Sequence, residues 1–348
     1  MFNTIVFSTL QKQPAEVAFV FLMEYFSRAP KPTTMRQLLL LATTVAFGVS
    51  SLQAQLNNLG KTVLGKLDKN PVNAILKTPD PISTSFKDVN MEGALEENFG
   101  NDKTYKPMTQ LQRTPNGGFV LQPGFYEAHM QSYCLKAGTY GPSKGDGYMY
   151  AATNGPREEA VLAIVRNSVQ YPNIKQSNIQ QLLWGIIAKT KFKDLQNNLK
   201  LIAAQLLTPQ QLVNLNGGAL GFVPDKVMQQ GIANLPAPVQ LVMEAENKLR
   251  GMLTSADATF EDMERIAVLA GIAPDDGSTK VPGGKWSLHP DGYYVRYMPQ
   301  GYSYTVTQIY VPEGATAVGK EFDPATHIAM PANTGKQRLI QSGRLHKE

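Results

Sequence analysis

Hydrophobic residues recur at helical spacing through the middle of the chain. The first set follows Gly155, and its members stand three or four positions apart or side by side: Val161, Ile164, Val165 and Val169. Further sets run through Ile179–Ile187, Leu195–Leu206, Leu241–Leu249 and Ile266–Ala270. Because this spacing places apolar side chains on one face of a helix, each set predicts an amphipathic helix. Residues 155–272 are therefore predicted to pack as one bundle of short helices.

Signals at the expected helix ends support this prediction. Pro156 suits a first helical position, and Thr208-Pro209-Gln210-Gln211 has the form of a capping box. Gly271 suits the end of the last helix, because glycine tolerates the left-handed backbone found there.

Two other segments show strand patterns in place of a helical period. Residues 114–150 begin with the turn signal Pro115-Asn116-Gly117-Gly118, and Phe125–Leu135 is rich in aromatic and apolar residues. Residues 285–312 have the pattern of a hairpin, with the parts Gly292–Met298, Pro299–Gly301 and Tyr302–Val311.

Each strand segment is too small to fold alone, since an isolated hairpin is marginally stable in water. We expect residues 114–150 and 285–312 to pair into one small antiparallel β unit, with the all-helical domain inserted between them. Separate docking of each segment onto the helices is the alternative. The predicted fold class is α+β with extended ends: residues 55–113 as an extended or partly disordered lead, and residues 313–348 as an irregular tail.

The N-terminal region has the layout of a secretory signal peptide. Met35-Arg36 is a short positive region, Leu38–Val49 is almost wholly apolar or small, and Ala54 is a small residue suited to cleavage. An apolar stretch of this length is too short to span a bilayer, which takes about 20 residues. Residues 35–54 are therefore predicted to be a cleaved leader.

The 34 residues before this leader are interpreted as an upstream extension from too early a start. The alternative keeps Met1 as the true start and makes Ala15–Phe47 a long membrane-anchored region. The first interpretation predicts a periplasmic or secreted protein with no transmembrane span in the mature chain.

Composition narrows the class of protein without naming a function. The chain has 348 residues, 43% of them hydrophobic and 18% charged, with a formal net charge of +5. These values exclude collagen-like, coiled-coil and wholly disordered proteins. Since no run of basic residues accompanies the mild charge, no nucleic-acid partner is predicted. The single cysteine, Cys134, leaves an exported chain without an internal disulfide.

Cys134 invites a nucleophile hypothesis in which His129 is the base. Residues five apart on a strand point to opposite faces, so the two side chains are not expected to meet unless a bulge intervenes. We interpret Cys134 as a small buried residue. The four histidines show no paired spacing, and we predict no zinc site and no cofactor. Two distant histidines that meet a carboxylate in space are the alternative.

Two glycine-rich stretches resemble ligand-binding loops only in part. Gly138–Gly147 lacks the Gly-Lys-Ser/Thr ending of a phosphate loop, and no helix begins directly after it. Asp146-Gly147 and Asp275-Asp276-Gly277 fall short of the alternating carboxylates of a calcium loop. All of them are interpreted as turns.

Paired carboxylates are the main enzymatic option. Glycan hydrolases place two carboxyl groups on either side of the scissile bond, one of them kept protonated by an apolar setting. Glu127 lies among aromatic residues and Asp291 lies in a turn, which makes these two the catalytic candidates.

The last hairpin carries the aromatic side chains most like a binding surface. If Tyr297 faces Tyr302 across the turn, one face consists of Tyr293, Val295, Tyr297, Tyr302, Tyr304 and Val306. This face is the more apolar one, so we expect it to be the core face. A ligand would then contact residues near or on the opposite face, with Trp286, Tyr294 and Arg296 as the candidates.

These observations favour an exported, non-enzymatic structural or binding protein of the cell envelope or extracellular space. Its expected partner is an envelope protein or a glycan. The alternative is a secreted hydrolase that cleaves polysaccharide or peptidoglycan with Glu127 and Asp291. A third option is a periplasmic assembly factor that uses the helical domain as a docking groove.

Overall fold

The computed structural model describes residues 79–216, 237–277 and 280–346. These residues belong to one compact unit, Leu67–Glu348. The predicted leader at 35–54 and the predicted extension at 1–34 lie outside the described residues. Secretion and an envelope location therefore gain no support from the structure and stay predictions.

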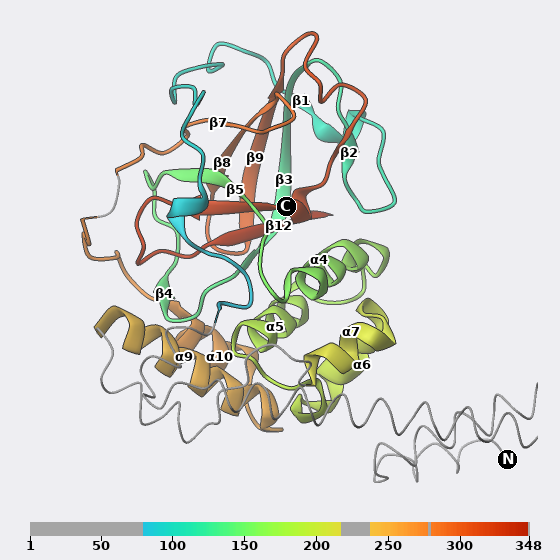
Figure 1. Cartoon of the computed structure of the whole chain (residues 1–348), viewed down its shortest axis with the longest axis vertical. Coiled ribbons are helices and arrows are strands. Elements are labelled where there is room, and N and C mark those ends of the chain that lie inside the picture. The colour runs from blue at the N-terminus through green and yellow to red at the C-terminus, as the bar shows by residue number, and fades with distance from the viewer. Residues whose placement is uncertain (1–78, 217–236, 278–279, 347–348) are drawn as a thin grey trace, which may run out of the picture. The chain divides into compact units, whose positions relative to one another are not determined.

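Eight of the described strands form one large sheet that curls into a nearly closed, barrel-like body (Figure 1). Every pairing along its main path is antiparallel. The first and last strands of this path approach each other, and the backbone N–H of Tyr150 donates a hydrogen bond of 2.7 Å to Ser287 Oγ across the seam. In spatial order the strands are β5 (Tyr148–Ala152), β11 (His327–Pro331), β12 (Leu339–Leu345), β3 (Gly124–Cys134), β9 (Tyr304–Val311), β8 (Tyr294–Pro299) and β7 (Ser287–Leu288).

Several short elements complete the sheet structure. The two-residue strand β1 (Lys106–Pro107) pairs in parallel with β3. Two small sheets join β2 (Phe119–Val120) to β10 (Glu321–Phe322), and β4 (Thr139–Tyr140) to β6 (Val268–Leu269). Single 3-10 turns occupy Phe86–Asp88, Met108–Gln110, Ser168–Gln170, Phe192–Asp194 and Pro324–Thr326.

The helices gather on one side of the barrel, in the lower half of Figure 1. They are α4 (Glu158–Asn167), α5 (Gln176–Ile187), α6 (Asn197–Leu206), α7 (Pro209–Leu215), α9 (Ala237–Thr254) and α10 (Phe260–Ala267). The capping box at Thr208 and Gln211 is confirmed. The helix start predicted at Pro156 and the helix end predicted at Gly271 are wrong. Helix α4 begins two residues after Pro156, and α10 ends four residues before Gly271.

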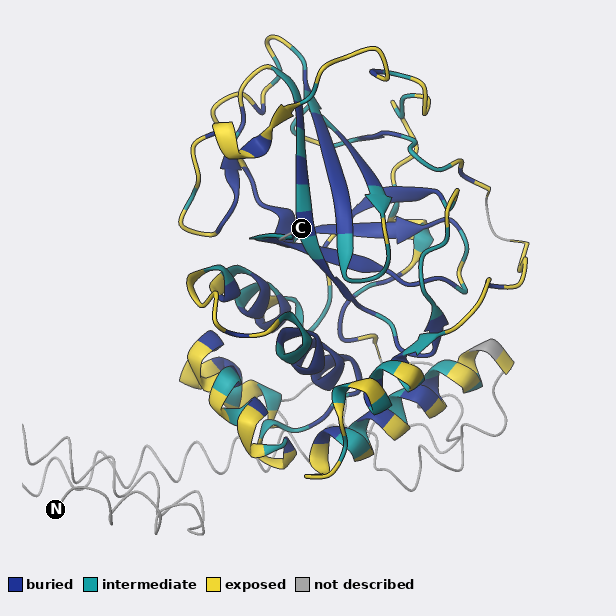
Figure 2. Ribbon diagram, turned by 180° about the vertical axis from the view of Figure 1, so that it is seen from behind, coloured by how far each residue is buried: buried dark blue, intermediate teal, exposed yellow. Residues whose placement is uncertain are grey.

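Two hydrophobic cores share several strands. Met130, Tyr297 and Ile309 belong to the core inside the barrel. Tyr133 and Ile340 face the other way and pack with the helical side chains in the second core. Strands between the two cores are buried on both faces, as the dark blue strands of Figure 2 show. The helices therefore complete the burial of the sheet and do not form a separate domain.

The predicted fold class is wrong in its architecture. Strands from both sides of the helical region do pair, through β3 and β9, but the sheet is neither small nor limited to those segments. Strands β11 and β12 come from the segment predicted to be an irregular tail, and β12 lies between β11 and β3. The description as a helical domain with a β hairpin is wrong for the same reason, because β8 and β9 are two strands of the larger sheet.

The predicted register of the hairpin is also wrong. Tyr297 pairs with Thr307 and not with Tyr302, because the connection between the strands is longer than expected. An offset by an odd number of residues reverses which side chains of a strand face the core. Tyr293, Val295 and Tyr297 are buried as expected, whereas the inward residues of β9 are Thr305, Thr307 and Ile309.

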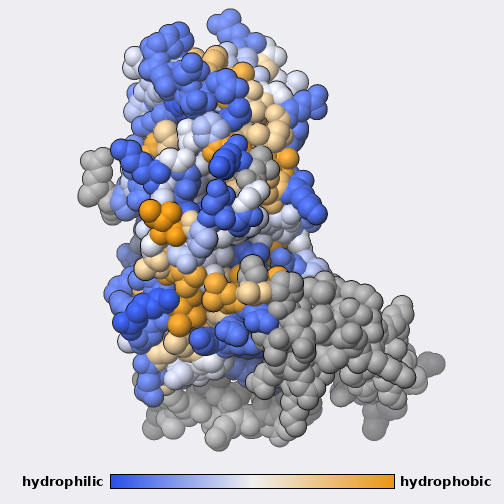
Figure 3. Space-filling model, turned by 90° about the vertical axis from the view of Figure 1, so that its left-hand side faces the viewer, coloured by the Kyte–Doolittle hydropathy of each residue, from blue (hydrophilic) through white to orange (hydrophobic). Residues whose placement is uncertain are grey.

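The outer surface of the helical layer carries some exposed apolar side chains. Figure 3 shows apolar residues gathered in the lower half of one face of the molecule. On α9, Val239 and Leu241 are 37% and 45% exposed. Within the described ranges, no helix combines the length and hydrophobicity that a membrane crossing requires.

Candidate functional site

Four of the five predicted site residues lie on or against the outer face of β3, β9 and β8. Arg296 is the centre of this group, and its guanidinium is buried. It donates hydrogen bonds to Gln308 Oε1, to the Glu97 carbonyl at 2.9 Å, to Asn101 Oδ1 at 3.2 Å and to the Tyr105 hydroxyl at 3.1 Å. Protein groups therefore already occupy the donors that were expected to hold a ligand.

The two aromatic candidates beside Arg296 are also engaged. Trp286 is fully buried, and the Arg296 guanidinium carbon lies 4.5 Å from the centre of its ring. Tyr294 is half-buried and stacks on Tyr310, with 5.8 Å between ring centroids. The sequence located a real cluster, but its contacts are those of a packed structural network.

The two catalytic candidates are held by separate partners. Glu127 accepts a hydrogen bond of 2.5 Å from Gln308 Nε2, and its other carboxylate oxygen lies 3.2 Å from His129 Nε2. Asp291 pairs with Lys320 at 2.5 Å in the turn before β8, and this contact lowers the pKa of Asp291. Glu127 lies two strands from Arg296, which corresponds to about 10 Å of sheet, and Asp291 lies five residues before Arg296 in the chain. The structure does not bring the two carboxyl groups together.

His129 and Cys134 point to opposite faces of β3, as their spacing predicts. His129 contacts Glu127 on the outer face, while Cys134 lies in the barrel core. Burial, and then the charge of Glu264, raises the pKa of the Cys134 thiol well above its usual value. A base and a thiolate are therefore not paired here.

Two distant histidines do meet near a carboxylate inside the end of the barrel. The rings of His289 and His327 stack with 5.0 Å between centroids, and Asp291 lies 3.7 Å from His289. Burial lowers the pKa of His289 to about 4 and that of His327 to about 3, so both rings are neutral near pH 7. His327 also pairs with the Tyr293 hydroxyl at 2.5 Å. In the part of the chain that the structure describes, no three potential metal ligands converge.

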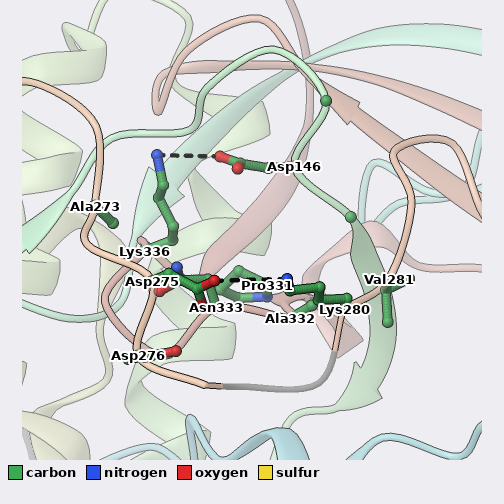
Figure 4. Close-up of a pocket in the computed structure, with 12 residues that line it drawn as sticks. Asp146, Ala273, Asp275, Asp276, Lys280, Val281, Pro331, Ala332, Asn333 and Lys336 are labelled. Atoms are coloured by element: carbon green, nitrogen blue, oxygen red, sulfur yellow. Dashed lines mark ion pairs between the residues drawn. The ribbon is translucent and has the colours of Figure 1, made fainter.

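A cavity of about 230 Å³ lies where the turn at Gly145–Gly147 meets the turn at Asp275–Gly277 (Figure 4). The sequence predicted both segments to be turns without a ligand. Gly145-Asp146-Gly147 forms part of one wall, and Asp275 and Asp276 form another. The remaining lining residues are Ala273, Lys280, Val281, Pro331, Ala332, Asn333 and Lys336. Segments more than a hundred residues apart in the chain thus build one polar hollow, which is the candidate functional site.

The first wall is held by a buried lysine. Lys336 is 1% exposed, and its ammonium lies 3.3 Å from the Asp146 carboxylate. The same ammonium donates to the Gly141 carbonyl at 3.3 Å and to the Ser143 hydroxyl. Asp146 also accepts from the Ser143 backbone N–H at 2.6 Å. These bonds fix a buried cation and its carboxylate partner in one geometry, as buried charges require.

Glycine is required where this wall meets the next segment. A Cβ atom built on Gly147 would lie 2.1 Å from the carbonyl oxygen of Val281. Any larger residue would therefore separate the two segments that close the cavity.

The second wall is more open to solvent. Lys280 and Asp275 form an ion pair of 3.6 Å, and their side chains are 87% and 70% exposed. Asp276 accepts a hydrogen bond from the Thr334 hydroxyl, and Asn333 donates to the Pro274 carbonyl at 3.2 Å. This side combines exposed charged groups with hydrogen-bonded polar ones at the cavity mouth.

The lining of the cavity carries more carboxylates than ammonium groups. Among the described lining residues, Asp146, Asp275 and Asp276 face the cations Lys280 and Lys336. Behind the wall, burial lowers the pKa of Arg338 to about 10, and Asp276 is one of the charges that oppose this shift. Arg338 therefore remains a cation near pH 7, although it does not line the cavity.

Sequence reasoning missed Lys336, because it lies in the segment expected to be irregular. The signals that could have marked the site were the Asp-Gly turns, and both were interpreted only as turns. They are turns, since Gly145 and Gly277 have φ values of +90° and +73°. Nothing local shows that they share a cavity.

Comparison of the sequence with protein-family models and with curated proteins, and of the structure with solved structures, finds no match. The geometry of the cavity therefore carries the functional proposal.

Proposed function

We propose that this protein is a non-enzymatic binding protein that receives a small polar group of a glycan or a protein partner in the cavity beside Lys336. The observation that supports the proposal is a polar hollow whose inner charges are already ordered by the fold. The Lys336 ammonium uses its three N–H donors on Asp146, Gly141 and Ser143, so it fixes the inner wall. Contact with the ligand would fall to Asp275, Asp276 and Asn333, which line the more open side.

Export remains part of the proposal and rests on residues 35–54. With that leader, the protein would meet its partner in the cell envelope or outside the cell. The partner would enter from the side of Asp275 and Lys280, whose side chains are 70% and 87% exposed.

The hydrolase alternative has no comparable support. Its two carboxyl groups must flank one bond, at separations of about 5–10 Å. Glu127 and Asp291 bond to different partners in different parts of the barrel, and no hydrogen bond, ion pair or ring contact joins them.

Binding to an array of envelope glycans and peptides, followed by calorimetry on each compound retained, tests the proposal. We expect Asp276→Asn and Asn333→Ala to weaken binding by about tenfold, or about 1.4 kcal/mol, each. The matched control is Asp102→Asn, which removes a carboxylate that is 73% exposed and outside the cavity lining. Equal binding by the wild type and the cavity variants would refute the site. Shortening of a bound glycan or peptide would refute the non-enzymatic proposal.

A further inference from the structure

We infer that the turn at residues 289–292 is an acid-sensitive latch at one end of the barrel. A neutral pair of stacked histidines, His289 and His327, holds the turn closed near pH 7, and protonation of His289 releases it. Neither histidine lines the cavity, so the inference goes beyond the proposed binding function and does not depend on it. It rests on the bonds that fix each ring, on the groups around the pair and on the contacts that tie the turn to the barrel.

The hydrogen-bond partners of His327 determine which ring nitrogen carries its proton. Nδ1 lies 2.8 Å from the carbonyl oxygen of Asp323, and a carbonyl oxygen only accepts, so Nδ1 carries the proton. Nε2 therefore accepts a hydrogen bond of 2.5 Å from the Tyr293 hydroxyl. A second proton on this buried ring would place a donor against the donating hydroxyl of Tyr293.

His289 closes the turn because one of its nitrogens is an acceptor. The backbone N–H of Asp291 donates to His289 Nδ1 at 3.1 Å, so the neutral ring carries its proton on Nε2. An asparagine side chain closes a turn in the same way, by accepting from the backbone two residues later. A proton on Nδ1 turns the acceptor into a donor and removes this bond, so the closed turn requires a neutral ring.

The surroundings of the pair disfavour a positive charge. The rings of His289 and His327 are 5.0 Å apart between centroids, so a proton on each would bring two cations into contact. Tyr150 and Tyr293 enclose His289 further, with ring centroids 4.9 Å and 4.3 Å from its own. Burial raises the pKa of both tyrosines, so neither offers a negative charge near pH 7.

The charged groups beside the turn only partly offset this effect. The Asp291 carboxylate lies 3.7 Å from His289 Nδ1 and favours a proton there. Lys320 engages the same carboxyl group at 2.5 Å and opposes that proton. Burial is the largest influence, and it lowers the pKa of His289 to about 4. Burial and then the neighbouring His289 lower the pKa of His327 to about 3.

The turn is tied to the barrel by contacts that can break without loss of the core. It follows β7, which has two residues, and its inner bond joins the His289 backbone N–H to the Tyr293 carbonyl at 2.8 Å. From the connection between β9 and β10, the Thr316 hydroxyl donates to the Asp291 carbonyl at 2.6 Å. Thr316 and Lys320 are both exposed. Segments held by exposed hydrogen bonds open at lower cost than core strands, so we expect the opening to stay local.

The direction of the pH effect follows from proton linkage. His289 has a pKa of about 4 in the closed turn and regains its ordinary value of 6.5 in an open, solvated one. The open form binds more protons between these values, so the closed form is complete above pH 6.5 and is lost as pH falls towards 4. Between pH 7 and 4.5, this difference favours the open form of a fully solvated ring by about fiftyfold.

Hydrogen exchange of the Asp291 amide at pH 7 and 4.5, corrected for the intrinsic exchange rate, tests the latch. In the wild type we expect its protection to fall by at least about tenfold on acidification, while the amides between β3 and β9 keep theirs. His289→Asn is the deciding variant, since its side-chain oxygen accepts the same N–H and does not titrate. Its protection should be equal at both pH values. The control His129→Asn, on the outer face of β3, should behave as the wild type does.

The outcomes decide the inference without reference to any ligand. Unchanged protection in the wild type, or the same loss in His289→Asn, would overturn it. Equal loss at Asp291 and between β3 and β9 would also overturn it, because that result indicates global unfolding. If His289→Asn does not fold, nitrogen chemical shifts of the labelled wild type at pH 7 decide: the latch requires the proton on Nε2 of His289 and on Nδ1 of His327, and a proton on Nδ1 of His289 would refute it. Failure of the latch leaves the binding proposal untouched.

Discussion

Glu246 provides the sharpest test of the packing between the helices and the barrel. It lies on α9 beside a small cavity of about 10 Å³ that is also lined by Asp80, Leu135, Lys136 and Ile187. Burial raises the pKa of this carboxyl to about 7. Asp80 raises it further, while the positive charges of Lys189, Lys136 and Arg250 oppose the shift. We predict that Glu246→Gln will alter how stability depends on pH.

The sign follows from proton linkage. Glu246 has a pKa near 4.5 in the unfolded chain and about 7 in the folded protein, so the folded protein binds more protons between these values. The stability that comes from the protonated carboxyl is complete below pH 4.5 and is lost as pH rises through 7. At about 1.4 kcal/mol per pKa unit, the shift corresponds to about 3 kcal/mol. Solvent screening of this partly exposed side chain reduces the expected change to about 1–3 kcal/mol.

Urea unfolding of the wild type and Glu246→Gln at several values between pH 4.5 and 8 provides the measurement. The glutamine variant does not titrate, so subtracting its curve removes the contribution of other groups, the buried histidines included. The wild type should lose about 1–3 kcal/mol relative to the variant across this range. Glu244→Gln on the exposed side of the same helix is the control. Parallel curves for the wild type and Glu246→Gln would refute the reasoning.

Three further predictions follow from groups buried in or against the barrel. Tyr293→Phe should lower the free energy of unfolding by about 1–2 kcal/mol, since it removes a buried hydrogen bond to His327. Tyr297→Phe should leave stability unchanged or raise it, since that buried hydroxyl has no hydrogen-bond partner. Urea unfolding of both variants compares the two effects. Arg296→Ala should destabilise by about 3 kcal/mol or more, because it removes a buried side chain together with its hydrogen bonds to Gln308, Glu97, Asn101 and Tyr105 and its contact with the Trp286 ring. The same assay applies. Cys134 should resist a thiol reagent in the native protein and react at once in urea, as measured by absorbance.

Local periodicity explains which elements were predictable from the sequence. All described α-helices fall within residues 155–272, because a period of 3.6 is visible in a short window. The opposite orientations of His129 and Cys134 were predictable for a similar reason, since the period of a strand depends only on its own residues. The register of β8 against β9 was not predictable in this way, because it depends on the length of a turn whose residues permit several conformations.

The C-terminal strands were missed because both of their faces are buried. In β12, Leu339 lies in the barrel core and Ile340 lies in the helical core, so no alternation of polar and apolar residues appears. The strand also contains Gln341, Ser342 and Gly343, which are typical of loops. Only the pairing of β12 with β3 and β11 shows why these residues are extended and buried.

The same missing strands explain why the cavity was not foreseen. Lys336 precedes β12, and the contact with Asp146 spans 190 positions of the chain, a separation at which no local pattern carries information. Because β11 pairs directly with β5, the connection from β11 to β12, which contains Lys336, lies beside the turn that precedes β5 and contains Asp146. The cavity is therefore a product of strand order, and loops held by a rigid sheet are suited to recognition. A fold in which residues 313–348 were an irregular tail would contain neither the buried lysine nor the binding site proposed around it.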